Sequence, residues 1–350
     1  MSWREAYLSD LVFFQRGYDI TKDKQVEGDV PVISSSGVSS YHAEAMAKGP
    51  GVVIGRKGSL GSVHYSEHDY WPHDTTLWSK DLKGNDAKYV YYYLKTLHLE
   101  NFNVGNSNPT LNRNHIHNLR VMIPELSVQR SISSCLSHYD DLIEINRRRI
   151  ELLEQAARLL YKEWFVHFRF PGHEHVKIVD GVPVNWERKS LGQVAPLQYG
   201  KALKAENRVD GPNPVFGSSG VVGYHATSLV EGPAIIVGRK GNVGSVFWSD
   251  SDCYPIDTVY FIDKSRSSLF LYYSLLNMNF ISTDVAVPGL NRDFAHSREV
   301  LVPDEKIIDE FHRVVVPIYQ QISVLEKYNS KLARARDLLL PRLMNGEIAI

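Results

Sequence analysis

Residues 31–78 read PVISSSGVSSYHAEAMAKGPGVVIGRKGSLGSVHYSEHDYWPHDTTLW, and residues 214–261 read PVFGSSGVVGYHATSLVEGPAIIVGRKGNVGSVFWSDSDCYPIDTVYF. The two stretches align without a gap at an offset of 183 residues, and 23 of the 48 aligned positions are identical. At an offset of 179 the agreement continues as Leu111-Asn112-Arg113 and Leu290-Asn291-Arg292, and then as a long helical pattern in each half. The chain is therefore a tandem duplication, with one globular unit and one long helix in each half.

The composition fits two such units. Its 350 residues allow two domains of about 120 residues, each able to bury its own core, and two helices of about 40. A formal net charge of −1 argues against indiscriminate coating of nucleic acid, so any contact must come from local patches. With Cys135 and Cys253 alone, a disulfide framework is excluded. No signal peptide and no apolar run of about 18 residues occurs, which predicts a cytoplasmic protein without membrane contact.

Heptad patterns predict that the two helices pair. From Ser127 to about Phe165 there is no Pro or Gly, and apolar residues recur every seven positions in two rows, as they do after position 304. At 1.5 Å per residue, about 40 helical residues make a rod of roughly 60 Å, which suggests a spacer. The rows are Leu136, Ile143, Ile150, Ala157 with Tyr139, Asn146, Leu153, Leu160, and Val315, Ile322, Asn329, Arg336 with Ile318, Leu325, Leu332, Leu339.

Two features interrupt these patterns. Asn146 and Asn329 stand in the seams, where a polar residue often fixes the register of the paired helices. The alternative is a partly exposed Asn at a frayed part of the interface. Pro317 removes a backbone donor, so we expect the second helix to kink or to restart there.

A β-branched run leads into Gly-Arg-Lys-Gly in each half, at residues 55–58 and 238–241. This pattern predicts two strands joined by a tight glycine turn. The Arg-Lys pairs would then stand at or beside the turn, within reach of a phosphate. The glycine spacing matches neither nucleotide-binding loop motif, and no nucleophile and base occur in a supporting context. We therefore expect no catalytic centre and no metal site.

A nuclease is the enzymatic alternative. Asp74 followed by Asp81 resembles the acidic cluster of a metal-dependent nuclease, but the second half keeps Asp257 and has Lys264 where the second acid would stand. We interpret Asp74-Thr75 and its counterpart as structural or DNA-facing turn residues. A stand-alone nuclease would cleave DNA in the presence of Mg²⁺ without partners.

Two phrases resemble one protein family. Residues 163–174, EWFVHFRFPGHE, and residues 338–348, LLLPRLMNGEI, are similar to the segment after the first helix and to the C-terminal ending of type I restriction–modification specificity subunits. The resemblance extends over nearly the whole chain. It implies an α+β fold with two similar mixed α/β target-recognition domains, separated by two long helices in an antiparallel coiled coil, with an internal pseudo-twofold repeat.

The expected parts are a first target-recognition domain at 1–125, a spacer helix at 126–170, a linker at 171–184, a second domain at 185–303 and a second helix at 304–346. In such a protein the chain is a non-catalytic reader of double-stranded DNA, with one half-site per domain and an asymmetric, bipartite site. The partners implied are methyltransferase subunits that bind S-adenosylmethionine and restriction subunits that use ATP and Mg²⁺, with no cofactor in this chain. The alternative is a scaffold whose helices and domains bind only proteins.

Residues shared by both halves are expected to position DNA, because domains that read different sequences must differ where they contact base edges. For His42 and His225 a hydrogen-bonded core role is equally open. The predicted DNA-binding residues are Ser35, Ser36, Tyr41, His42, Arg56, Lys57, Ser59, Asn112, Arg113, Ser218, Ser219, Tyr224, His225, Arg239, Lys240, Asn242, Asn291 and Arg292. Base reading is expected at Glu44–Met46 and Thr227–Leu229, at Ser59-Leu60 and Asn242-Val243, and at Asn101–Asn108.

Overall fold

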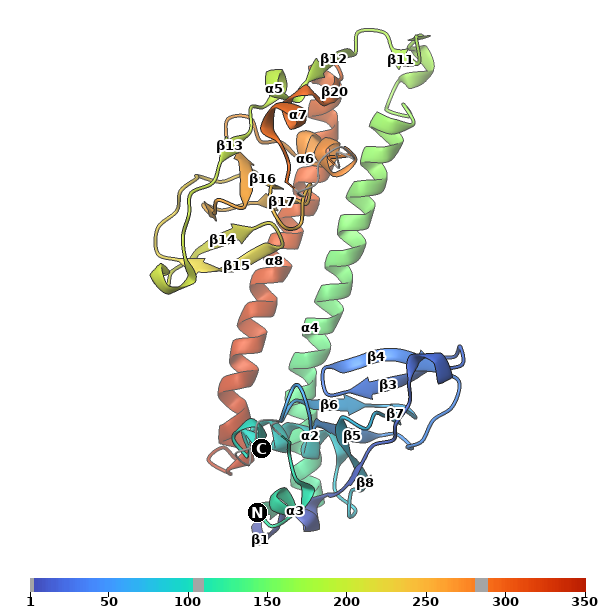
Figure 1. Cartoon of the computed structure of the whole chain (residues 1–350), viewed down its shortest axis with the longest axis vertical. Helices are drawn as coiled ribbons and strands as arrows, with labels where there is room; N and C mark the ends of the chain where they lie inside the picture. The colour runs from blue at the N-terminus through green and yellow to red at the C-terminus, as the bar shows by residue number, and fades with distance from the viewer. Residues whose placement is uncertain (1–2, 103–109, 281–288) are drawn as a thin grey trace. The chain divides into compact units, whose positions relative to one another are not determined.

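The computed structural model describes residues 3–102, 110–280 and 289–350. The chain folds into two compact units. The first unit comprises residues 1–146 and 328–350, and the second comprises residues 147–327. Two long helices, α4 (Leu126–Tyr161) and α8 (Glu305–Met344), contribute a segment to each unit (Figure 1).

Among the described residues of the first unit, short strands form three small sheets. A four-stranded antiparallel sheet has the order β2-β8-β5-β6, and a three-stranded sheet has the order β4-β3-β7 with β3 and β7 parallel. The strands are β2 (Phe13–Arg16), β3 (Val30–Ser34), β4 (Gly37–His42), β5 (Gly51–Gly55), β6 (Val63–Ser66), β7 (Trp71–Pro72) and β8 (Thr76–Asp81). The terminal pair is β1 (Trp3–Tyr7) with β9 (Arg120–Pro124), and the short helices are α1 (Leu8–Leu11), α2 (Ala87–Lys95) and α3 (Arg113–His117).

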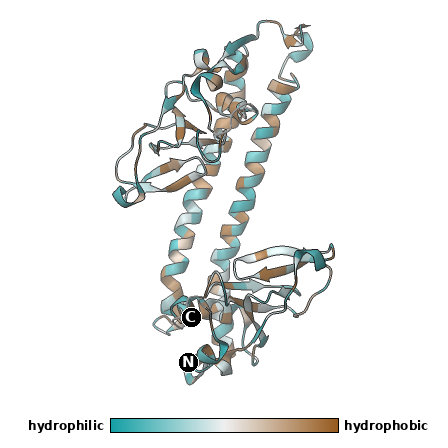
Figure 2. Cartoon of the chain, viewed as in Figure 1, coloured by the Kyte–Doolittle hydropathy of each residue, from teal (hydrophilic) through white to brown (hydrophobic). Residues whose placement is uncertain are grey.

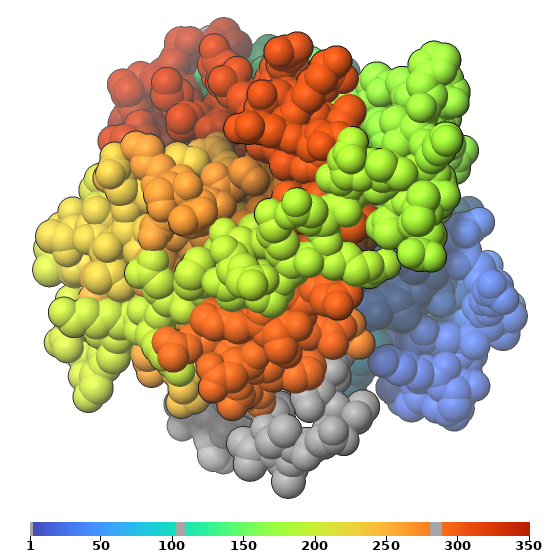
Figure 3. Space-filling model, turned by 90° about the horizontal axis from the view of Figure 1, so that it is seen from above, coloured from blue at the N-terminus to red at the C-terminus, as the bar shows by residue number. Residues whose placement is uncertain are grey.

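The second unit repeats this arrangement. Its four-stranded sheet has the order β13-β19-β16-β17 and its three-stranded sheet the order β15-β14-β18. The strands are β13 (Gln198–Tyr199), β14 (Asn213–Gly217), β15 (Gly220–His225), β16 (Ala234–Gly238), β17 (Val246–Ser249), β18 (Tyr254–Pro255) and β19 (Val259–Ile262). The terminal pair is β12 (Glu187–Ser190) with β20 (Glu299–Val302), and the short helices are α5 (Leu191–Val194), α6 (Leu269–Leu276) and α7 (Arg292–Ser297). In Figure 3 the yellow-green segment with β12 and α5 lies across the orange segment with α7 and β20.

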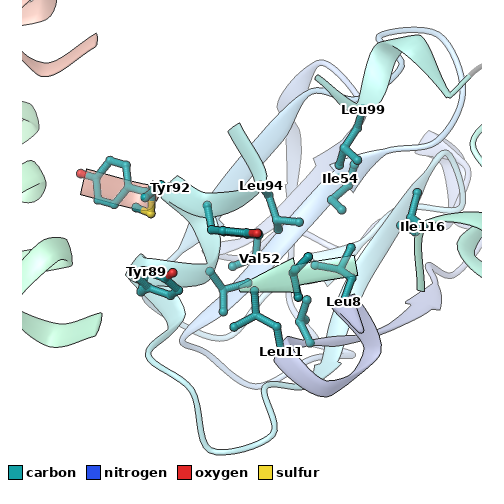
Figure 4. Close-up of a cluster of buried hydrophobic side chains, with 14 of the residues drawn as sticks. Leu8, Leu11, Val52, Ile54, Tyr89, Tyr92, Leu94, Leu99 and Ile116 are labelled. Carbon is teal, nitrogen blue, oxygen red and sulfur yellow. The ribbon is translucent and has the colours of Figure 1, made fainter. Parts of the chain in front are cut away.

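The central strands are hydrophobic on both faces because each sheet is covered on both sides. All five residues of β5 and all five of β16 are buried. In the first unit, α1, α2 and α3 pack their apolar side chains around Val52 and Ile54 of β5 (Figure 4). Burial of each such aliphatic side chain contributes about 1.5–3 kcal/mol, so this cluster is the main source of the unit's stability.

Each core is completed by the end of the long helix that belongs to the other repeat. The end of α8 places Leu340, Leu343 and Met344 in the core of the first unit, together with Leu8 and Leu136. At the offset of 179 residues, the same three positions are occupied by Tyr161, Trp164 and Phe165. These aromatic residues lie in the second unit's core, where they pack around Phe311 and Val315. The repeat in the sequence is therefore a repeat in the packing.

Within each unit the segments of α4 and α8 pack together and run antiparallel. In the first unit Asn146 donates to Asn329 Oδ1 at 2.9 Å, and Asp140 pairs with Arg336 one to two turns away. The second unit brings Tyr161 against Phe311, with their ring centroids 6.2 Å apart. Brown and teal residues alternate along both helices in Figure 2, as expected for helices with one buried stripe. Since the two Asn side chains bond to each other across the packed helices, the register interpretation is favoured over a frayed interface.

The predicted fold class is confirmed: both halves are mixed α/β, and the two long helices pack together. A restart of the second helix at Pro317 is wrong, because α8 runs without a break from Glu305 to Met344. Pro317 lies on an exposed position of the helix, where water can donate a hydrogen bond to the carbonyl that the proline leaves without a backbone donor. The prediction of a tight turn between β5 and β6 is also wrong, because seven residues join these two strands.

The buried end of α8 predicts a difference between two leucines on that helix. Leu343 is 1% exposed and lies in the core, whereas Leu338 is 62% exposed. Replacing Leu343 with Ala should lower the free energy of unfolding by about 2–5 kcal/mol, because it leaves a cavity. Replacing Leu338 with Ala should change it by less than about 0.5 kcal/mol. Urea unfolding of the purified chain measures both values, and equal losses would contradict this packing.

Candidate nucleic-acid interface

The Gly-Arg-Lys-Gly segment of the first unit is held by backbone hydrogen bonds from two other motifs. The Arg56 and Lys57 amides donate to the Thr75 carbonyl at 2.8 and 3.1 Å. The Leu111 amide donates to the Arg56 carbonyl at 3.0 Å. Three segments that are far apart in the sequence, Gly-Arg-Lys, Asp-Thr and Leu-Asn-Arg, therefore meet at the end of β5.

The second unit uses the same contacts. The Arg239 and Lys240 amides donate to the Thr258 carbonyl at 2.9 and 3.0 Å, and the Leu290 amide donates to the Arg239 carbonyl at 2.8 Å. These bonds need only the backbone, so they fix the path of the loop, and the Arg239 guanidinium adds a bond to the Asp257 carbonyl at 3.0 Å. The shared residues thus build one loop scaffold twice.

Serine hydroxyl groups tie this scaffold to the turn between β3 and β4 in the first unit and to the turn between β14 and β15 in the second. Ser62 donates its hydroxyl to the Ser35 carbonyl, and Ser245 donates to the Ser218 carbonyl at 2.6 Å. Gly241 has a φ of +80°, and a Cβ on it would lie 3.1 Å from Ser218 Oγ. The glycine is therefore required both by the backbone conformation and by the close approach of the hairpin. Ser35 is 8% exposed, so its main role in this structure is within the scaffold.

The Leu-Asn-Arg segments start short helices beside the loop. Asn112 caps α3 by accepting from the Asn114 amide at 3.0 Å, and Asn291 caps α7 by accepting from the Asp293 amide at 2.8 Å. A side-chain oxygen at this position satisfies amides that have no partner within the helix. The following residues, Arg113 and Arg292, are exposed, which leaves their guanidinium groups available at the surface.

The predicted DNA-binding residues of the β3–β4 and β14–β15 hairpins differ in exposure. Tyr41 and Tyr224 are 59% and 57% exposed, and Ser36 and Ser219 are exposed as well. His42 is 5% exposed, and its Nδ1 accepts from the Val26 amide at 2.9 Å. The equivalent nitrogen of His225 accepts from the Val209 amide at 3.0 Å. Both histidines hold the loop that precedes β3 or β14, and the burial of His42 favours for it the core role that the sequence left open, whereas His225 is half-buried.

The predicted base-reading segments lie at the surface where they are described. Exposed residues include Glu44–Met46, Thr227–Leu229, Ser59 and Asn242, while Leu60 and Val243 are half-buried. Most of the segment Asn101–Asn108 lies outside the described residues. Whether any of these residues contacts DNA stays a prediction.

A charged group that sequence reasoning missed lies next to the loop of the first unit. Arg16, the last residue of β2, pairs with Asp74 at 2.9 Å. Partial burial lowers the pKa of Arg56, and the neighbouring Arg16 charge lowers it further, whereas Asp74 opposes this effect. In the second unit the Arg239 guanidinium lies over the Tyr199 ring, 5.0 Å from its centroid. Arg16 and Tyr199 occupy equivalent positions, so comparison of the repeats at the offset of 183 could have singled them out.

The ion pairs of the acidic residues and the sequence of the second unit argue against a metal-dependent catalytic centre. Asp19, His73 and Asp74 offer ligand atoms within 4.8 Å of one another. Asp74 already pairs with Arg16, and the second unit has Ala202 and Ile256 at the equivalent places of the other two. Asp81, the second acid of the nuclease alternative, pairs with Lys83 at 2.9 Å.

Within the described ranges, no helix combines the length and apolarity needed to cross a bilayer.

Comparisons with known proteins agree on one family. The family described as "Type I restriction modification DNA specificity domain" matches residues 2–155 and 183–312. The MjaIX specificity subunit of Methanocaldococcus jannaschii is 24% identical over 305 residues, covering 76% of this chain and 70% of the relative. The HindI specificity subunit of Haemophilus influenzae is 26% identical over 329 residues, covering 69% and 71%. The type I S subunit from M. genitalium has the same fold, with a TM-score of 0.66 at 19% identity over 98% of this chain and 96% of that one.

Two equivalent histidines anchor the loop scaffold and predict a pH dependence. The Phe14 amide donates to His117 Nε2, and the Leu197 amide donates to His296 Nε2, both at 2.9 Å. Burial, helped by the neighbouring Arg113 or Arg292, lowers the pKa of each imidazole below 6.5. Between the folded-state pKa and the unfolded-state value of about 6.5, the unfolded chain binds more protons than the folded chain. The stability that each neutral histidine contributes is therefore fully present above about pH 6.5 and is lost as the pH drops through the folded-state pKa.

His117→Gln should weaken this pH dependence, because glutamine can accept the same hydrogen bond and does not titrate. Urea unfolding at several values between about pH 7 and pH 5 measures it. His115→Gln, an exposed change on the same helix, serves as the control and should keep the wild-type slope. If both variants keep the wild-type dependence of stability on pH, His117 does not contribute to it.

Proposed function

The chain belongs to the type I restriction–modification DNA specificity family, and on this basis we propose that it reads an asymmetric, bipartite DNA site with one half-site per unit. As a specificity subunit it is non-catalytic, and the enzyme activities lie in partner subunits. Each unit would contact one short half-site. The modification and restriction subunits would act where the chain has bound.

One observation carries the proposal: the same loop scaffold is built in both units, while the residues around it differ. Backbone contacts that recur in both units suit a constant ligand, and the phosphate backbone of DNA is constant. Side chains that differ suit base edges, whose donor and acceptor patterns change with sequence. Two domains with one scaffold and different surroundings would select two different half-sites.

The shared cations are proposed to contact phosphates. Lys57 and Lys240 follow the arginines whose backbone is fixed at the end of β5 or β16, so their ammonium groups extend from a defined point. Arg113 and Arg292 stand at the start of exposed helices beside the same loop. Since the net charge of the chain is −1, these local groups, and not an overall field, would supply the attraction.

The partners are proposed on the basis of family membership. Methyltransferase subunits with S-adenosylmethionine would dock on the long helices, and restriction subunits with ATP and Mg²⁺ would join them. Exposed apolar side chains on α4, such as Leu142, Leu152 and Leu159, at 49%, 57% and 61%, are consistent with a further protein surface there. The same feature would suit the scaffold alternative, which predicts assembly without any DNA preference.

A base-resolution map of DNA methylation tests the proposal. Cells that carry this chain with its methyltransferase subunit should show a new adenine mark on a two-part motif with a constant unspecified gap. Cells with the methyltransferase alone should lack it. Partner binding without any new mark would overturn the proposal and favour the scaffold.

The phosphate contacts predict a change in salt dependence. Lys57→Ala should weaken binding to all DNA sequences and reduce the slope of log K against log salt by about one unit. Lys331→Ala, an exposed change on α8, is the control and should keep the wild-type slope. Titration of the assembled complex with labelled duplexes at several salt concentrations measures both. Equal slopes would remove Lys57 from the phosphate contacts.

A further inference from the structure

One position beside the shared loop differs in chemical class between the two units. It is residue 16 in the first unit and residue 199 in the second, at the offset of 183. In both units it lies near the arginine of the Gly-Arg-Lys segment, Arg56 or Arg239, and the aspartate of the Asp-Thr turn is Asp74 in the first half and Asp257 in the second. The varying residue is Arg16 in one unit and Tyr199 in the other.

In the first unit the Arg16 guanidinium is oriented and still accessible. Its Nη2 lies 2.9 Å from Asp74 Oδ2, and its side chain is 55% exposed, against 22% for Asp74. The other oxygen of Asp74 lies 3.2 Å from His73 Nδ1, which also contacts Thr75 Oγ1 at 2.9 Å. A guanidinium has five N–H donors, so the contact with one aspartate oxygen leaves others directed to solvent.

In the second unit two guanidinium groups lie close to the Tyr199 ring. Arg239 lies 5.0 Å and Arg292 lies 5.1 Å from the ring centroid. The Tyr260 ring contacts Tyr199 edge-on, with the ring centroids 5.1 Å apart. Such cation–π contacts hold the two arginines in place, while Tyr199 stays 49% exposed.

The same anchor fixes this position in both units. The strand that ends at Arg16 is tied to α3 by the hydrogen bond that the Phe14 amide donates to His117. The segment before Tyr199 is tied to α7 through the bond from the Leu197 amide to His296. Residues 16 and 199 are therefore presented at the same place on one scaffold, next to the cations proposed to contact phosphates.

Resting on the proposed function, we propose that position 16/199 is a specificity-determining position that makes the two half-sites different. Arg16, oriented by Asp74, donates to a purine edge of the first half-site, and guanine, with its O6 and N7 acceptors, is the base that an arginine fork selects. Tyr199 offers a ring and one hydroxyl in place of the fork, so it selects a different base in the second half-site. Asp257 stands where Asp74 does, so an arginine placed at position 199 has a carboxylate to orient it.

Methylation mapping of cells that carry the full chain with its methyltransferase subunit tests this inference. The variants are Arg16→Lys, Arg16→Tyr and Tyr199→Arg. Arg16→Lys keeps the charge and loses the fork, so preference at one G·C pair should fall by about tenfold or more. The other half-site and the gap should stay as in the wild type. Tyr199→Arg should change one base of the opposite half-site only.

The wild-type map separates the two proposals. A wild type without a bipartite motif would overturn the proposed function, and the inference would fall with it. A bipartite wild-type motif that stays unchanged in Arg16→Lys and Tyr199→Arg would overturn the inference alone. Uniform loss of methylation without a change of motif would do the same, since it indicates a phosphate contact. If Arg16→Tyr fails to assemble with the methyltransferase subunit, Arg16→Lys decides for the first unit.

Discussion

The structure depends on one packing arrangement: each unit's core is closed by the end of a long helix from the other repeat. Leu340, Leu343 and Met344 of α8 close the first core, and Tyr161, Trp164 and Phe165 close the second. Since most of the stability of a helix in a protein comes from packing of its apolar face, these contacts stabilise the ends of α4 and α8, which have 36 and 40 residues. Both units therefore require both repeats, and the terminal residues of the chain belong to the same unit as its first strand.

A polar contact complements this apolar arrangement. The hydrogen bond between Asn146 and Asn329 stands in the packed seam of α4 and α8, and the pair of Asp140 with Arg336 lies along the same interface. Apolar seams tolerate slippage by a heptad, whereas an Asn that slips loses its partner. The polar residues thus define the register that brings the helix ends to their cores.

The recognition surface separates constant from variable chemistry. Backbone hydrogen bonds to Thr75 and Thr258 fix the loops without using any side chain. Side chains such as Arg16 and Tyr199 can then change between repeats without altering the scaffold. A duplicated gene can in this way acquire two different specificities, because the residues that keep the loop in place are not those that vary.

The sequence by itself determined the duplication, the mixed α/β class and the two long helices, because identity at a fixed offset and heptad spacing can be read from the order of residues without knowing which segments meet in space. It also singled out the Arg-Lys and Asn-Arg motifs as candidates for contact with DNA, and the structure brings the two motifs together in both units. Only the tertiary structure decided that His42 is buried, that α8 continues through Pro317, and that Arg16 pairs with Asp74 across 58 residues. These outcomes depend on which segments approach in space, and the burial and partner of a side chain are set by that approach and not by its neighbours in the chain.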